Sequence, residues 1–316
     1  MAKINQLGLG CMSMSRANAE KSARTIRAAL DMGVEIFNTG EFYKAGESEL
    51  VVGQALRDVP RDKYFLSVKF GVLPAPDGSI YGLDVNPHNI KAHLVYSLKR
   101  LGADYVDLYQ PARMDLAYPV EEIVGEISKL VEAGYVRHIG LTQVDEETLR
   151  RANKVHPIHT VELRYSLAER EYERNGLITT AHELGANVLT FGVLAHGLLN
   201  DGILSGKSKS SLPAGLLSPQ NLPDNLKLVA ALKQIADKKS TTVSQLALAW
   251  VFAKFPFVQS LVGTTSAEHL KESVDALELA LTAEDVAAIE AAFPPEKVKG
   301  AGMPEFVCRN GKLING

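Results

Sequence analysis

The chain has 316 residues, of which 46% are hydrophobic and 22% are charged, as in an ordinary soluble globular protein. Its formal net charge of −3 gives no electrostatic reason to bind nucleic acid or an anionic membrane. Two cysteines make no disulfide framework, the first residues lack a signal peptide, and no stretch of about 18 apolar residues occurs, so we expect a cytoplasmic protein without a membrane span.

Eight short apolar runs alternate with longer segments of helical periodicity. In chain order the runs are QLGLGCM, VEIFNT, YFLSVKF, YVDLYQP, RHIGLTQ, HTVELRYS, NVLTFGVL and FVQSLVGTT. The helical segments that follow all but the seventh run are expected at 19–33, 47–57, 87–101, 120–134, 146–154, 173–184 and 267–277. Strands that alternate with helices in this way lie parallel, and the crossover helices pack on the outer face of the sheet.

Eight such units are expected to close into a (β/α)₈ TIM barrel, a fold of about 250 residues that tolerates insertions. We therefore predict one α/β domain over residues 1–316. A long insertion, 195–256, separates the seventh and eighth strands, and it ends with helical patterns at 223–237 and 243–253. This insertion could fold over a ligand, and the irregular tail after residue 293 could cross the barrel mouth. The alternative, an open doubly wound sheet, is weaker because GLGCM is not the glycine-rich turn G-x-G-x-x-G.

Polar residues stand at the ends of the second and third predicted strands. In a barrel of this kind the active site lies at the carboxyl ends of the strands, and there the chain places Asn38, Tyr43 and Lys69. An ammonium next to a phenol favours the ionised phenol, so we expect Lys69 to lower the pKa of Tyr43 and to assist it as a proton donor. Taken alone, the same pair is more often an ordinary half-buried tyrosine and a surface lysine.

The sequence resembles the aldo-keto reductases over nearly its whole length. The resemblance lies in the order and spacing of GLGCM, FNTGEFY, FLSVKFG, VDLYQPARMD, VRHIGLTQV, VELRYSL, HGLLND and LVGTTSAEHLKES. Within the family the chain is most similar to the pyridoxal reductases, through its GEFY run, its QPAR segment and HPIHTVELRYSL. The resemblance implies an NADPH-dependent barrel enzyme that reduces small aldehydes.

The resemblance also implies the catalytic residues. Tyr43 takes the place of the proton donor, Lys69 that of the lysine beside it, and Asn38 that of the usual aspartate partner of the lysine. The usual histidine, which orients the carbonyl, is replaced by Ala112. Asn38 can accept a hydrogen bond from Lys69 but has no charge, so we expect the pKa of Lys69 to be lowered. Glu41 is one candidate for the missing negative charge.

A second set of residues is implied for the nicotinamide end of the cofactor. Thr142 and Gln143 stand where the family holds the nicotinamide carboxamide. Glu162 replaces the usual glutamine that serves the same group, and Phe191 replaces the aromatic residue that stacks on the nicotinamide ring. Stacking needs a ring face and no hydroxyl, so phenylalanine suits this place, although it suits a hydrophobic core equally well.

Two further segments match the phosphate-binding loops of the family. Gly197 and Leu199 match the loop along the pyrophosphate, whereas Thr264, Ser266 and His269 match the loop around the 2′-phosphate. The polar residues of the second loop would also cap the last barrel helix, and a capped helix N-terminus attracts phosphate as well. Because His269 stands where a basic residue is common, the preference for NADPH over NADH is an open question.

Several alternatives remain at this stage. Arg113 and Asp115 are expected to form a structural ion pair at the barrel rim, and the histidine spacings predict no metal site. The favoured substrate is pyridoxal, whose hydroxyl beside the aldehyde would replace part of the orienting role of the histidine. Another aldehyde, ketone or sugar is the alternative substrate. Since Asn38 and Ala112 replace two catalytic residues, an NADPH-binding regulatory barrel is a third possibility. We expect a monomer or weak homo-oligomer.

Overall fold

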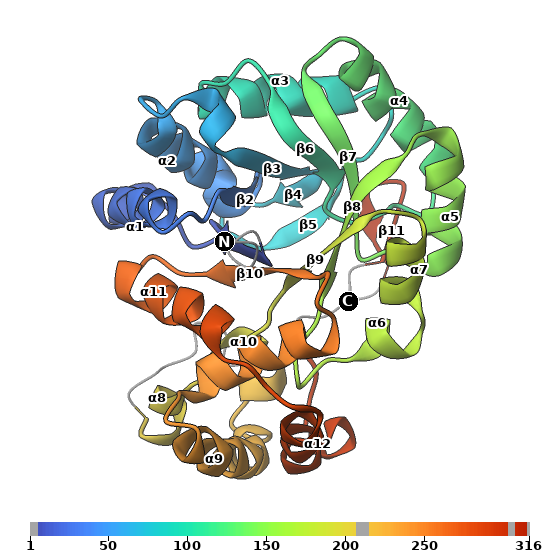
Figure 1. Cartoon of the computed structure of the whole chain (residues 1–316). Coiled ribbons are helices and arrows are strands. Elements are labelled where there is room, and N and C mark those ends of the chain that lie inside the picture. The colour runs from blue at the N-terminus through green and yellow to red at the C-terminus, as the bar shows by residue number, and fades with distance from the viewer. Residues whose placement is uncertain (1–5, 207–214, 303–306, 315–316) are drawn as a thin grey trace.

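The computed structural model describes residues 6–206, 215–302 and 307–314, and in it eight parallel strands close into a barrel surrounded by helices (Figure 1). Around the barrel the strands follow the order β1-β10-β9-β8-β7-β6-β3-β2. They are β1 (Leu7–Gly10), β2 (Ile36–Gly40), β3 (Phe65–Phe70), β6 (Val106–Pro111), β7 (Val136–Thr142), β8 (Ile158–Arg164), β9 (Asn187–Phe191) and β10 (Gln259–Gly263). The predicted (β/α)₈ barrel is confirmed, and each of the eight apolar runs overlaps one of these strands.

Amphipathic helices cover the outside of the barrel. In α4 the buried residues Val120, Ile123, Val124, Ile127 and Leu130 recur at helical spacing, so one face of the helix packs on the strands. The helices that follow barrel strands are α1 (Ala19–Asp31), α2 (Glu47–Leu56), α3 (Ile90–Leu101), α4 (Val120–Glu132), α5 (Glu146–Val155), α6 (Glu171–Arg174), α7 (Leu177–Glu183) and α11 (Ala267–Asp275).

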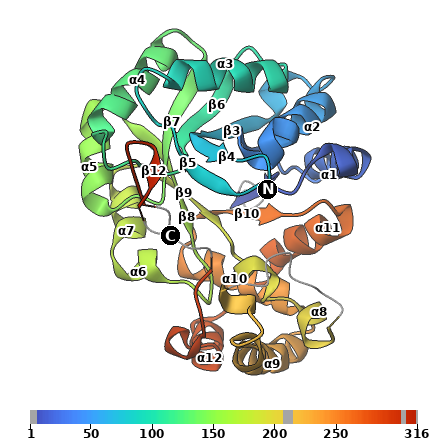
Figure 2. The ribbon, with the colours of Figure 1, turned by 180° about the vertical axis from the view of Figure 1, so that it is seen from behind.

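The sixth crossover and the insertion differ in detail from the predicted pattern. One helix was expected at 173–184, but the structure has α6 and α7, separated where Gly176 adopts a φ of 83° that a continuous helix does not allow. The insertion contains α8 (Asp201–Leu204), α9 (Leu222–Lys238) and α10 (Val243–Lys254), and α12 (Ala283–Ala292) follows later (Figure 2). The 3₁₀ turns are Arg16–Asn18, Tyr43–Gly46, Arg61–Lys63, Ala195–Gly197, Gly215–Leu217, Ala276–Glu278 and Pro295–Lys297.

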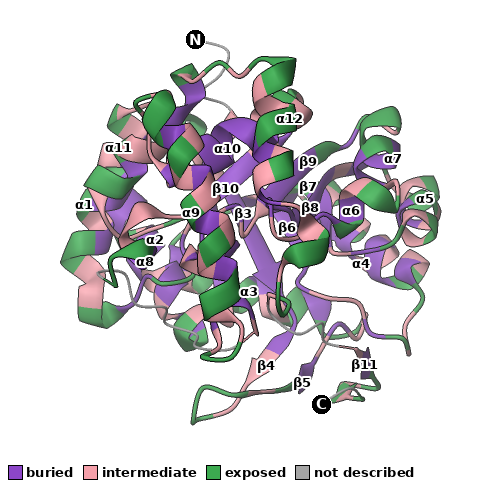
Figure 3. Ribbon diagram, turned by 90° about the horizontal axis from the view of Figure 1, so that it is seen from below, coloured by how far each residue is buried: buried purple, intermediate pink, exposed green. Residues whose placement is uncertain are grey.

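A small second sheet lies beyond the carboxyl end of β3. The strands β4 (Val72–Pro74) and β5 (Ile80–Leu83) follow β3, and β11 (Cys308–Arg309) and β12 (Lys312–Leu313) come from the chain end. The sheet has the order β11-β12-β5-β4 and extends from one end of the molecule (Figure 3). The expectation of an irregular tail is therefore wrong for residues 308–313. Cys308 is fully buried and packs with Ala112, Val72 and Leu83.

The strand register determines which side chains can meet inside the barrel. Asn38 is the Cα partner of Ser67, Lys69 is the partner of Gln110, and Thr142 is the partner of Glu162.

In the part of the chain that the structure describes, no helix is long and apolar enough to span a bilayer.

Candidate active site

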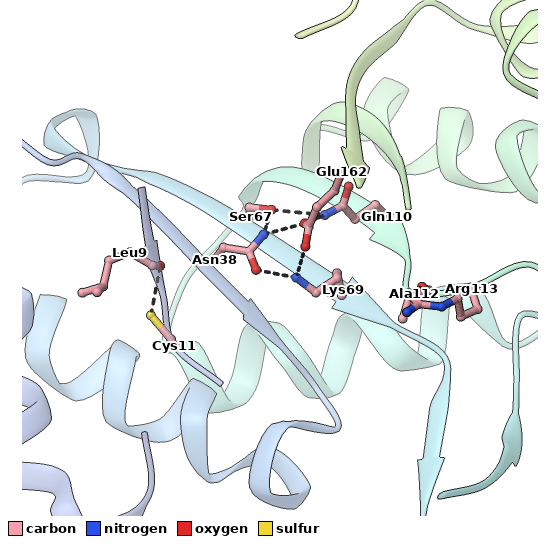
Figure 4. A network of polar contacts seen from close by, with 9 residues as sticks. All are labelled: Leu9, Cys11, Asn38, Ser67, Lys69, Gln110, Ala112, Arg113 and Glu162. Atoms are coloured by element: carbon pink, nitrogen blue, oxygen red, sulfur yellow. Dashed lines mark hydrogen bonds and ion pairs between the residues drawn. The ribbon is translucent and has the colours of Figure 1, made fainter. Parts of the chain in front are cut away.

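A buried polar network joins the carboxyl halves of β2, β3, β6 and β8 (Figure 4). Lys69 Nζ donates to Glu162 Oε1 at 2.7 Å and also to Asn38 Oδ1. Glu162 Oε2 accepts hydrogen bonds from Asn38 Nδ2 at 2.8 Å and from Gln110 Nε2. The side chains of Lys69 and Glu162 are only 4% and 2% exposed. The network therefore surrounds a desolvated ion pair whose anion accepts three side-chain hydrogen bonds.

Ser67 is a member of the network that the sequence analysis did not predict. Its hydroxyl accepts a hydrogen bond from Asn38 Nδ2 at 3.0 Å. Ser67 lies two residues before Lys69, so both side chains point to the same face of β3. That spacing was the available signal, because the strand alternation alone places residue 67 beside the lysine inside the barrel.

The charge of Glu162 makes the pKa of Lys69 shift in the direction opposite to the predicted one. Burial disfavours the ammonium, but Glu162 and Tyr43 favour it, and the pKa of Lys69 is raised above its ordinary value. The expectation of a lowered pKa is therefore wrong, because it assumed that no carboxylate lies near the lysine. Glu41 is not that carboxylate. It accepts a hydrogen bond from the Gly71 N–H at 2.7 Å and pairs with His93 Nδ1 at 2.9 Å.

Tyr43 lies next to this ion pair, in the 3₁₀ turn after β2. Lys69 Nζ is 5.3 Å from the centre of the phenol ring, and the Phe42 ring packs edge to face at 4.7 Å. Burial raises the pKa of Tyr43 above its ordinary value, although Lys69 acts in the opposite direction. The predicted lowering is thus wrong in its net direction. The phenol remains protonated at neutral pH and can donate its proton.

The backbone after Tyr43 is unusual. Lys44 and Ala45 have φ angles of 51° and 52°, a left-handed conformation that residues with a Cβ rarely adopt. Such local strain persists only where the surrounding structure fixes it, and it is frequent at functional sites. The turn therefore fixes the direction in which the chain leaves the Tyr43 position.

Residues 112–115 follow β6 and connect the site to the small sheet. Ala112 is buried and offers no side-chain donor, and Arg113 donates to the Ala112 carbonyl at 2.6 Å. Asp115 does not pair with Arg113, contrary to the prediction. It accepts hydrogen bonds from the backbone N–H groups of Asn310 and Gly311 instead. Burial lowers the pKa of Arg113, and Tyr172, Tyr43 and Glu162 act in the opposite direction.

Two residues expected at the nicotinamide have buried polar atoms available for a ligand. Thr142 Oγ1 and Gln143 Oε1 have no hydrogen-bond partner among the residues that the structure describes. Gln143 has a φ of 47°, and its N–H donates to the Glu162 carbonyl at 2.8 Å. Phe191 ends β9 beside Arg164 in the register of β8. These positions form one edge of the site, adjacent to the strand that carries Glu162.

The residues expected at the phosphates lie apart from the network. Gly197 ends a turn with a φ of 92°. The apolar side chain of Leu199 is fully buried, so the polar groups of this residue are those of its backbone. Ser266 Oγ accepts from the His269 N–H at 3.3 Å, and Thr264 Oγ1 accepts from the Ser266 N–H at 3.0 Å. The capping alternative is confirmed for Ser266, which is the N-cap residue of α11. Capping leaves the α11 N-terminus suited to an anion.

Known proteins are similar to this chain in sequence and architecture. The model of the Aldo/keto reductase family matches residues 6–293. The probable aldo-keto reductase 1 of Glycine max is 34% identical over 308 residues, which cover 94% of this chain and 88% of that protein. The glycerol dehydrogenase of Gluconobacter oxydans superposes with a TM-score of 0.79 at 26% identity, covering 96% and 95% of the two chains. An aldo/keto reductase of Klebsiella pneumoniae, solved with NADP and acetate, gives 0.73 at 27% identity over 92% of each.

The match to the family model extends over most of the chain, and the Glycine max relative is similar over nearly its whole length. The barrel order and the site at the strand ends agree with that match. The chain belongs to the aldo/keto reductase family.

Proposed function

We propose that the protein is an NADPH-dependent reductase that converts a small aldehyde to the alcohol, with pyridoxal as the favoured substrate. The observation that carries the proposal is the position of Tyr43, whose ring centre lies 5.3 Å from Nζ of Lys69 in the buried Lys69–Glu162 ion pair. A proton donor next to a fixed cation is what carbonyl reduction requires, because negative charge develops on the carbonyl oxygen.

The chain has groups that fit the proposed cofactor. Thr142 Oγ1 and Gln143 Oε1 are buried without a partner among the described residues, and they match the hydrogen-bonding needs of a carboxamide. Structures of Klebsiella pneumoniae relatives were solved with NADP and with NADPH, which supports the same cofactor here. When bound, NADPH supplies the hydride for the carbonyl carbon. Phe191, Gly197, Leu199, Thr264, Ser266 and His269 are proposed to contact the rest of it.

The protein groups divide the remaining chemistry. Tyr43 holds a proton for the carbonyl oxygen, and Lys69 stabilises the phenolate that remains after the transfer. The low exposure of Lys69 and Glu162 strengthens this interaction, because water does not screen it. Asn38 orients Lys69 by accepting one of its hydrogen bonds.

Ala112 provides no donor to orient the carbonyl, which bears on the substrate. An aldehyde with an adjacent hydroxyl can orient itself by an internal hydrogen bond, and pyridoxal has this arrangement. The similarity of the GEFY and QPAR segments to the pyridoxal reductases supports the same choice. A second candidate is a polyol or sugar-like substrate, which the structural similarity to a glycerol dehydrogenase favours.

The proposal is tested by the rate of NADPH oxidation with pyridoxal, pyridoxal 5′-phosphate and benzaldehyde, with NADH as the cofactor control. Glycerol with NADP tests the second candidate in the direction of oxidation. We expect fast turnover of pyridoxal and slow turnover of benzaldehyde, which lacks the hydroxyl. Equal rates for both aldehydes would contradict the role of the substrate hydroxyl. Tight NADPH binding without turnover of any compound would favour a regulatory barrel.

A further inference from the structure

We propose that Glu162 is a positioning residue that supplies the negative charge for Lys69, so that the amide of Asn38 and the carboxylate of Glu162 can exchange places without loss of function. The inference rests on the proposed role of Tyr43 as proton donor. It assigns to Glu162 a task directed at the catalytic lysine, in addition to any contact with a cofactor.

The first argument is the geometry around the ammonium. Among the ion pairs of the described residues, Lys69 has one carboxylate partner, Glu162, at 2.7 Å. The other side-chain partners of Lys69, Asn38 Oδ1 and the Tyr43 hydroxyl, are neutral. A buried ammonium without a counter-charge loses its proton or destabilises the fold, so Glu162 is what keeps Lys69 charged.

The second argument is the orientation of the Asn38 amide. Its oxygen faces the cation of Lys69, and its nitrogen donates to Glu162 Oε2 at 2.8 Å. The reverse orientation would place the amide NH₂ against the ammonium and the amide oxygen against the carboxylate. The positions of the two charges therefore fix the amide, and the amide in turn holds the ion pair in place.

The third argument is that positions 38 and 162 are equivalent with respect to Lys69. Both side chains contact Lys69 Nζ, and each contacts the other. A carboxylate at either position, with an amide at the other, gives the ammonium one charged and one neutral acceptor. Two amides leave the cation without a counter-charge. Two carboxylates in contact cannot both ionise, so one would keep a proton.

This equivalence predicts that two substitutions, each harmful to kcat alone, largely compensate each other when they are combined. Glu162→Gln should lower kcat by about 100-fold, the lower end of the range for proton-transfer groups. The loss of kcat in Glu162→Gln should be greatest at high pH, where Lys69 is deprotonated, and smaller at low pH, where Lys69 is protonated again. Asn38→Asp alone should also be harmful. The double variant Asn38→Asp with Glu162→Gln should recover most of the wild-type kcat and its pH dependence.

The experiment compares the wild type, both single variants and the double variant. For each, kcat with pyridoxal is measured from pH 5.5 to 9.5, together with NADPH affinity and the Tm at each pH. Glu162→Gln should lower the Tm by roughly 6–10 °C, as expected for breaking a buried ion pair in a chain of this size. The double variant should regain most of that loss.

A matched control is Glu49→Gln. Glu49 is fully buried and accepts a hydrogen bond from Arg100 Nε at 2.5 Å, outside the network. This variant removes the same charge from another ion pair with a buried carboxylate, whose cation Arg100 is 27% exposed. It should lower the Tm without changing the shape of the kcat profile, so it separates loss of stability from loss of the proton-transfer environment.

A second double variant, Lys69→Met with Glu162→Gln, covers the case in which Glu162→Gln does not fold. Removing both charges should restore folding, because a buried pair can be replaced by uncharged groups, but it should not restore turnover. If neither double variant regains Tm, the charge on Glu162 does not serve Lys69 and the proposal is wrong. The same conclusion follows if Glu162→Gln keeps its Tm and kcat profile and loses only NADPH affinity.

Failure of the proposed function gives a different pattern. If the wild type reduces none of the aldehydes, the Tm values of the same variants still decide the charge exchange. A lower Tm in each single variant and a recovered Tm in the double variant Asn38→Asp with Glu162→Gln would support the role of Glu162 in that case. Absence of the recovery would overturn it whatever the substrate is.

Discussion

Tyr43 differs from its neighbours in the network because its ring and its hydroxyl have separate tasks. The ring packs edge to face on Phe42 and lies 5.3 Å from Lys69 Nζ. The hydroxyl is the part that carries the transferable proton. A substitution that removes the hydroxyl and keeps the ring therefore tests the chemistry without creating a cavity.

Tyr43→Phe should lower kcat for aldehyde reduction by at least about 100-fold, because general acid catalysis is lost. NADPH affinity, measured by fluorescence titration, should be unchanged. The control is Tyr64→Phe, which removes a hydroxyl just before β3, at the opposite end of that strand from Lys69. A Tyr43→Phe protein with more than a tenth of the wild-type kcat would contradict the assignment of the proton donor.

The pKa of Tyr43 leads to a prediction for the pH profile of the wild type. Because burial raises this pKa above the ordinary 10.0, the phenol keeps its proton through the neutral range and loses it only in more alkaline solution. The kcat for reduction should therefore stay constant through neutral pH and decline only above pH 10. The measurement is kcat at saturating substrate, with circular dichroism to show that the protein remains folded. A decline centred near pH 7 would mean that another group supplies the proton.

At the scale of elements, the space around two helical glycines shows how closely the outer helices pack. A Cβ on Gly53 in α2 would lie 2.3 Å from the Leu101 carbonyl oxygen at the end of α3. A Cβ on Gly125 in α4 would have no neighbour within 4 Å. The first glycine is needed for contact between helices, whereas the second only adds flexibility to its helix.

Alanine at these two positions should have opposite effects on the free energy of unfolding. Gly53→Ala should destabilise the protein by about 1–3 kcal/mol or more, because the clash is with backbone and the helices must separate. Gly125→Ala should stabilise it by roughly 0.5–1 kcal/mol through its higher helix propensity. Urea unfolding followed by circular dichroism measures both. Equal effects of the two substitutions would show that α2 and α3 do not pack this closely.

The difference between predicted and observed elements follows from how local each pattern is. The barrel strands and helices were predicted because alternation and helical spacing are visible within a dozen residues. The β12–β5 pairing joins Lys312 to Gly82, and strands of two residues have no periodicity to detect. The contact between Asn38 and Glu162 is likewise invisible in sequence, since 124 positions separate them. The predicted strand ends and the family resemblance indicated which polar residues line the site, but only the register showed which of them touch.

At the scale of the whole molecule, residues 308–313 return to the site, and Asp115 is one of the groups that hold them there. Asp115 is 1% exposed and accepts hydrogen bonds from the backbone N–H groups of Asn310 at 3.0 Å and Gly311 at 2.6 Å. The segment with β11 and β12 pairs with β5, and Cys308 covers Ala112. Asp115 thus connects the loop after β6 to a sheet built from two distant parts of the chain.

Asp115→Ala should loosen this sheet without unfolding the barrel. The N–H groups of Asn310 and Gly311 lose their acceptor, which should lower the free energy of local opening by about 1–3 kcal/mol. Hydrogen–deuterium exchange should accelerate at residues 308–313 and at β5, which pairs with β12. Exchange at β7 and β8 should not change. The exposed Asp104, just before β6, provides the control Asp104→Ala. If exchange at 308–313 stays as slow as in the wild type, the strand pairings hold the chain end without Asp115; faster exchange at β8 as well would mean that the small sheet and the barrel unfold as one unit.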